Sequence, residues 1–154
     1  MKIIDSFMFF DENMMSDLRL NIVDKYVSRF IICEATYNHN GQKKRLNFNI
    51  NNFSKFKSKI DYIILDKQPD NLKIIHKGDK GKKREHKILD TALIRENFQR
   101  NFVHNQLTEF DDNDLILIND LDELPDLEHF HYNKKITIFQ NKLLYSQFHL
   151  IYTA

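Results

Sequence analysis

The chain has 154 residues, which is enough for one domain with a hydrophobic core. Its 23 basic and 22 acidic side chains nearly cancel, to +1, so no overall field favours nucleic acid or an anionic membrane. A single cysteine, Cys33, excludes an internal disulfide framework, and no segment has the character of a signal peptide or a membrane span; we therefore expect a soluble, cytoplasmic protein.

The amino-terminal half is predicted to alternate strands with a helix. The apolar pair Ile3–Ile4 indicates a first strand, and apolar residues at nearly helical spacing predict an amphipathic helix within Asp11–Val27. Val27–Ala35 and Ile60–Leu65 are predicted strands. Cys33 lies inside the first of these apolar runs, so we interpret it as a small buried hydrophobe.

The carboxyl-terminal half continues this alternation. Lys73–His76 is a candidate short strand, and Glu85–Leu107 is the longest predicted helix. Leu115–Ile118 and Ile136–Phe139 are predicted strands, and Leu143–Tyr152 is an aromatic-rich strand or helix. Strands and helices that alternate in this way are typical of an α/β fold.

A basic stretch at residues 76–87 combines lysines, an arginine and two histidines with two glycines. Such a loop can follow a phosphate backbone, so nucleic-acid binding is one hypothesis. No aromatic residue is interleaved for base stacking, however, and Asp79 and Glu85 dilute the charge. We favour a mobile, solvated loop without nucleic acid.

The apolar run Leu115–Ile118 ends abruptly at an acidic cluster, Asn119–Glu123, and Pro125 then stops extended pairing. A continuous apolar run is typical of a strand buried on both faces of a parallel sheet. Ligands of such sheets bind beyond the carboxyl ends of the strands. The acidic cluster is therefore the first candidate for a functional site.

Within this cluster, Asp120 and Asp122 are two residues apart, so in an extended chain they face the same side while Leu121 points inward. Paired carboxylates repel each other unless a cation lies between them, and hard oxygen ligands suit Mg²⁺ or Mn²⁺ bound together with substrate phosphates. A metal-diphosphate site is one interpretation. A solvated acidic turn is the other, and the motif alone leaves both open.

Glu96 and Arg100 are four residues apart on the longest predicted helix, close enough to pair on one face. From the residues alone, an ion pair within the helix is the favoured explanation for Arg100.

Several separate stretches share their order and spacing with one family. They are Asp5-Ser6-Phe7 with Glu12, Leu18-Arg19-Leu20, Phe30–Glu34, Gly41 with Lys44 and Leu46, Arg95–Asn101, and Asp114–Pro125. In these features the chain resembles the family 17 glycosyltransferases, which include the β-1,4-mannosyl-glycoprotein β-1,4-N-acetylglucosaminyltransferase of animals. The resemblance covers nearly the whole chain.

This resemblance implies a GT-A-like nucleotide-sugar-binding fold with a mostly parallel central sheet flanked by helices. It also implies inverting, metal-dependent transfer of a sugar, most often GlcNAc from UDP-GlcNAc, to a hydroxyl of a glycan or oligosaccharide. Mn²⁺ or Mg²⁺ would be the cofactor. The resemblance gives no catalytic base for this chain.

Site residues follow from the same resemblance. Asp120 and Asp122 become the residues that bind the metal and the donor diphosphate, with Glu123 beside them. The remaining positions expected to line or support the donor pocket are Glu34, Lys44, Glu96, Arg100 and Asn101. A cation and a nearby basic side chain would stabilise the charge that develops on the leaving diphosphate.

Family members continue beyond the segment matched by Tyr152–Ala154, into a half that holds acceptor contacts. We therefore expect residues 1–154 to form a single family 17-like domain, the donor-binding portion, truncated at its carboxyl terminus. One alternative is a non-catalytic module that binds a nucleotide sugar or carbohydrate. A metal-dependent phosphohydrolase is disfavoured, because Leu124-Pro125 follows the acidic pair where that class places a small hydroxyl residue.

Overall fold

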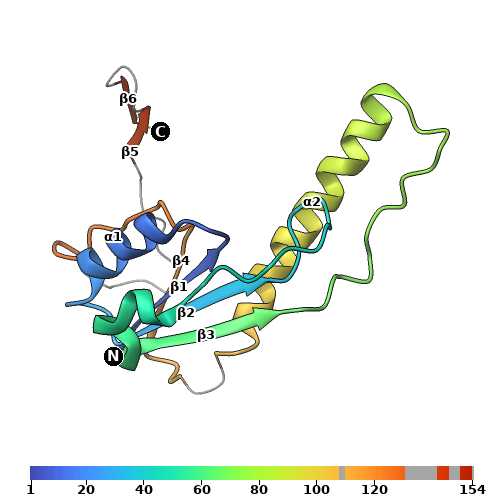
Figure 1. Cartoon of the computed structure of the whole chain (residues 1–154). Coiled ribbons are helices and arrows are strands. Elements are labelled where there is room, and N and C mark those ends of the chain that lie inside the picture. Colours follow the sequence, from blue (N-terminus) through green and yellow to red (C-terminus); the bar gives the residue numbers. More distant parts are fainter. Residues whose placement is uncertain (108–109, 131–141, 146–149, 154) are drawn as a thin grey trace.

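The computed structural model describes residues 1–107, 110–130, 142–145 and 150–153 (Figure 1). Its elements in chain order are β1 (Ile3–Phe9), α1 (Asn13–Val23), β2 (Arg29–Ala35), a 3-10 segment η1 (Ile50–Lys59), β3 (Ile60–Leu65), α2 (Gly81–His104), β4 (Leu115–Ile118), β5 (Lys142–Tyr145) and β6 (Leu150–Thr153). The strand predicted at Ile136–Phe139 lies outside the described residues. Two antiparallel strands, β5 and β6, occupy the described parts of the segment predicted as one strand or helix.

Four strands form a parallel sheet in the order β3-β2-β1-β4, and this confirms the predicted α/β class (Figure 1). The register places Ser6 of β1 beside Ile31 of β2 and beside Ile118 of β4. Because every strand runs the same way, the loops that leave their carboxyl ends meet at one edge of the sheet. The chemistry-bearing side chains are at this edge.

The alternation of side chains along the strands divides the core into two layers. On one face, Phe7 and Phe9 of β1 pack with Leu20 of α1 and with Phe53 and Phe56 of η1. Burial of such side chains contributes roughly 1.5–3 kcal/mol each. This layer fixes α1 over the strand that precedes it.

The second layer lies on the opposite face of the sheet. There Ile4, Ile31 and Cys33 pack against Val103 of α2. The carboxyl-terminal half of α2 is thus held on the sheet, whereas its amino-terminal half extends beyond it (Figure 1).

The prediction that Leu115–Ile118 is buried on both faces is wrong. β4 pairs only with β1 among the described strands, so it is an edge strand, and Ile118 is 53% exposed. The strand that is buried on both faces is β2, whose residues from Phe30 to Ala35 are all buried. Four apolar residues in a row cannot distinguish an edge from a centre, because this depends on which other strands pair with them.

Other predictions also differ from the structure. The first strand, predicted at Ile3–Ile4, continues to Phe9, and α2 ends at His104 rather than Leu107. Lys73–His76 forms no strand, and Ile74 is 71% exposed there. α2 begins at Gly81 rather than Glu85, so part of the basic stretch is helical.

Asp79 lies just before α2 and contacts basic side chains of its first turns. The side chain of Asp79 is buried and pairs with Lys83 and Lys87 of the first turns. The hydrogen bond from Lys87 and the backbone N–H of His76 hold the pKa of the Asp79 carboxyl well below its usual range. This carboxylate offsets cations that would otherwise repel the positive end of the helix dipole.

No helix in the described ranges has the length and hydrophobicity needed to cross a bilayer.

Burial of Cys33 generates a testable prediction. The thiol is fully buried, and burial raises its pKa to about 12. At pH 8 the native thiol should therefore contain on the order of a thousandfold less thiolate than an ordinary cysteine. We expect Ellman's reagent to react promptly in urea and hardly at all with the native protein. Equal rates in both conditions would contradict the burial.

Candidate functional site

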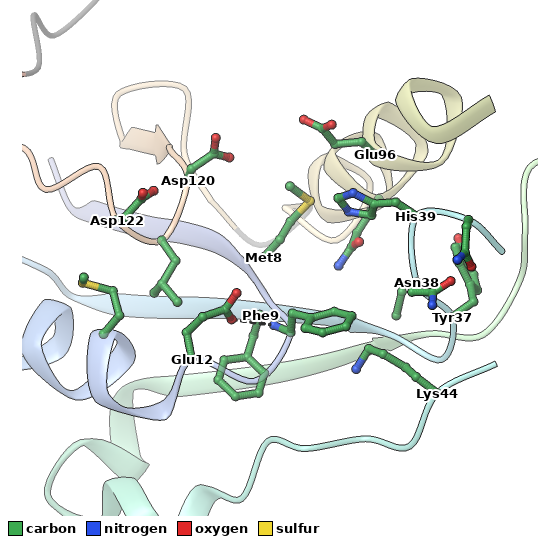
Figure 2. A pocket seen from close by; sticks show the side chains of 16 residues that line it. Met8, Phe9, Glu12, Tyr37, Asn38, His39, Lys44, Glu96, Asp120 and Asp122 are labelled. Carbon is green, nitrogen blue, oxygen red and sulfur yellow. Dashed lines mark hydrogen bonds between the residues drawn. The ribbon is translucent and has the colours of Figure 1, made fainter. Parts of the chain in front are cut away.

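A cavity of about 910 Å³ lies at the edge of the sheet where the strands end (Figure 2). Loops after β1, β2 and β4 form its walls, together with the middle of α2. Its lining residues are Met8, Phe9, Phe10, Glu12, Met15, Ala35, Tyr37, Asn38, His39, Asn40, Lys44, Glu96, Gln99, Asp120, Leu121 and Asp122. The cavity therefore occupies the position where open α/β sheets bind ligands.

Two carboxylates, those of Asp120 and Asp122, come from the loop after β4 and line the same wall (Figure 2). Leu121 between them is buried in the core, as the predicted alternation requires. Asp122 is exposed and makes no hydrogen bond or ion pair with any other described residue. Its oxygens are therefore available to a ligand.

Glu123 supports this loop from within. Its carboxylate accepts a hydrogen bond from the backbone N–H of Asp120 at 3.1 Å, and its own N–H donates to the Asp120 carbonyl at 3.0 Å. This reciprocal pair closes a tight turn. Glu123 therefore lies beside the acidic pair, as expected, but does not line the cavity.

Arg100 connects α2 to the acidic loop. Its guanidinium donates to Glu96 at 3.0 Å, which confirms the predicted helical pair, and to Asp120 at 2.6 Å. Partial burial lowers the pKa of Arg100, but the two carboxylates outweigh that effect and raise it. The pair between Arg100 and Asp120 joins residues 20 positions apart in different elements, so no local pattern indicated it.

Glu34 and Lys44 form a second polar cluster. The fully buried Glu34 carboxylate accepts bonds from the Lys44 ammonium, from the backbone N–H groups of Asn47 (2.8 Å) and Phe48 (3.0 Å), and from the Tyr62 hydroxyl (2.8 Å). Burial, with this hydrogen bond, raises the pKa of Tyr62. Glu34 therefore lies behind the cavity and supports it, while Lys44 reaches the lining and lies over the Phe10 ring.

Asn101 is exposed and does not line the cavity. Several lining residues were not predicted as site residues, among them Glu12 and the segment Tyr37–Asn40. The segment follows a strand directly and is rich in turn residues. Because ligands of parallel sheets bind beyond the carboxyl ends of the strands, its position could have indicated a role in the site. Glu12 belongs to a stretch that matches the family pattern, but no role was predicted for it. Its carboxylate accepts hydrogen bonds from the N–H groups of the two preceding residues, each at 3.0 Å.

The loop after β2 is fixed by Arg95, a nearly buried side chain of α2. Arg95 donates to the His39 carbonyl and to the Gln68 side chain, each at 3.0 Å. Gly41 has φ +84°, and a Cβ there would lie 2.4 Å from the Arg95 guanidinium. Glycine is needed at this position both for the backbone conformation and for the close approach.

The carboxylate set at the acidic wall fits a divalent cation that takes the rest of its ligands from a substrate. Among the described residues, no group of three or more histidine, cysteine or acidic side chains could hold a metal ion by itself. Asp120 and Asp122 offer hard oxygen ligands on an open wall. Mg²⁺ is usually bound in this way, by one or two carboxylates, phosphates and water.

A family model described as glycosyltransferase family 17 matches residues 1–152. No curated protein and no solved structure matches the chain.

The contact between Gly41 and Arg95 predicts the effect of a single added methyl group. Gly41→Ala should destabilise the protein by roughly 1–3 kcal/mol, because alanine is strained at this φ and clashes with the guanidinium. The measurement is urea denaturation. Gly78→Ala is the matched control, since nothing lies within 4 Å of a Cβ there, and it should change stability by less than about 0.5 kcal/mol. Equal effects of the two substitutions would contradict this account of the loop.

Proposed function

Because the chain belongs to glycosyltransferase family 17, we propose that the cavity binds its nucleotide-sugar donor and that this donor is UDP-GlcNAc. The family implies a nucleotide-sugar donor and a glycan acceptor. The acceptor is then a hydroxyl of a glycan or oligosaccharide, and transfer proceeds with inversion.

One observation carries this proposal. The Asp120 and Asp122 carboxylates share one wall of the large cavity, at the carboxyl edge of a parallel sheet. Two negative charges facing one space favour a cation between them and the anionic diphosphate of a donor. Bound Mn²⁺ or Mg²⁺ would neutralise the diphosphate and stabilise it as the leaving group.

The protein's own cations complement this acidic wall. Arg100 holds Asp120 at 2.6 Å, which fixes that carboxylate and limits its repulsion of Asp122. Lys44 lines the cavity, and Glu34 behind it fixes the position of the ammonium. A fixed positive charge in a partly enclosed site stabilises developing negative charge without reorganisation during the reaction.

Asp122→Asn tests the metal-diphosphate assignment. Asparagine keeps the size of the side chain but removes the charge, so UDP-GlcNAc binding in the presence of Mn²⁺ should weaken by at least about tenfold. The measurement is calorimetric titration with and without Mn²⁺. Wild-type binding should depend on the metal, and UDP-glucose and GDP-mannose should bind less tightly than UDP-GlcNAc.

Asp112→Asn is the matched control, because Asp112 is exposed and does not line the cavity. It should bind the donor as the wild type does. If Asp122→Asn bound UDP-GlcNAc with unchanged affinity and metal dependence, Asp122 would lose its assigned role. Tighter binding of another nucleotide sugar would replace the proposed donor while leaving the site in place.

A further inference from the structure

Arg19 is a fully buried arginine on the inner face of α1. A buried guanidinium is costly unless it is paired and its N–H groups are bonded. Asp5 of β1, which is also fully buried, accepts from Nε at 2.8 Å and from Nη2 at 2.7 Å. This bidentate ion pair neutralises the charge of the guanidinium and leaves its Nη1 free to bind elsewhere.

Nη1 of Arg19 binds the backbone of the acidic loop. It donates to the carbonyl oxygens of Asp120 at 2.9 Å, Leu121 at 3.1 Å and Glu123 at 2.8 Å. These three carbonyls lie on both sides of Asp122. One buried cation, more than 100 positions earlier in the chain, thus fixes the backbone that carries both cavity carboxylates.

Arg100 holds the Asp120 side chain of this loop at 2.6 Å, but it does not bind the loop backbone. The other contacts of the loop backbone are weaker or local. The Asn119 N–H reaches the Ser6 carbonyl only at 3.4 Å, beyond the usual range, and the bonds between Asp120 and Glu123 stay inside the turn. Repulsion between the Asp120 and Asp122 carboxylates favours their separation. The bonds from Arg19 hold the turn against that repulsion, because they tie its carbonyls to β1 and α1.

We propose that Arg19 is the positioning residue for the Asp120–Asp122 pair, acting through the loop backbone to hold the two carboxylates for a divalent cation. This inference rests on the proposed function. Arg19 does not line the cavity, so its effect on the carboxylates passes through the loop backbone. Its role resembles that of groups behind metal ligands, whose loss commonly weakens metal binding by about 10–100-fold.

Two variants distinguish a positioning role of Arg19 from a general contribution of its side chain to the stability of the protein. The double variant Asp5→Leu with Arg19→Met replaces the buried pair by apolar side chains, a change that is often neutral for folding. Arg19→Lys keeps a charge opposite Asp5, but one ammonium cannot reproduce the guanidinium fork that serves both the carboxylate and the carbonyls. Val23→Ala, one turn along the same buried face of α1, is the control for lost stability.

Two measurements are made on each full-length variant. Free Mn²⁺ is followed by electron paramagnetic resonance during titration in the presence of UDP, and hydrogen exchange of residues 115–127 is followed without metal. Both Arg19 variants should bind Mn²⁺ about 10–100-fold more weakly and lose amide protection in this segment. Val23→Ala should unfold at a lower temperature, yet bind Mn²⁺ as the wild type does.

A folded double variant with wild-type Mn²⁺ affinity and wild-type protection would overturn the inference. So would full rescue by Arg19→Lys, since that outcome would mean that Arg19 only balances the charge of Asp5. A failure of the proposed function gives a different result. The wild type itself would then bind no Mn²⁺ in the presence of UDP, and this would contradict both the donor site and the positioning role.

Discussion

The acidic wall of the cavity depends on the hydrogen bonds of one buried group, the guanidinium of Arg19. It joins Asp5 in the first strand to three carbonyls of the loop after β4. Arg19 of α1 contacts both Asp5 and that loop, so both lie on the side of the sheet that α1 covers. The early part of the chain therefore determines the geometry of a site whose carboxylates come much later.

The same arrangement recurs at the other walls of the cavity. Glu34 at the end of β2 holds the segment 44–48, and Arg95 of α2 holds the loop that contains Gly41. In each case a buried or nearly buried charge binds backbone groups of a loop, and Glu34 also holds the lining side chain of Lys44. Loops normally move more than the elements they connect, so such fixed charges are a physical means of keeping a loop-built site in shape.

Sequence patterns predicted much of the fold because they depend on neighbours along the chain. The strands at Ile60–Leu65 and Leu115–Ile118 and the pair between Glu96 and Arg100 were confirmed. The early start of α2 was missed because residues 81–87 contain no apolar side chain that would mark a helical period. The edge position of β4 in the sheet was not predicted, because four consecutive apolar residues do not show which strands will pair with them.

The sequence by itself determined the α/β class, the family and the acidic pair at the end of a strand, since periodicity and motif spacing are local properties. It could not decide that Arg100 would reach Asp120, that Glu34 would lie behind the cavity, or that Arg19 would hold the acidic loop. Those contacts join residues between about ten and a hundred positions apart. Only the tertiary structure brings such groups within hydrogen-bonding distance, because the parallel sheet places the ends of separate strands at one edge.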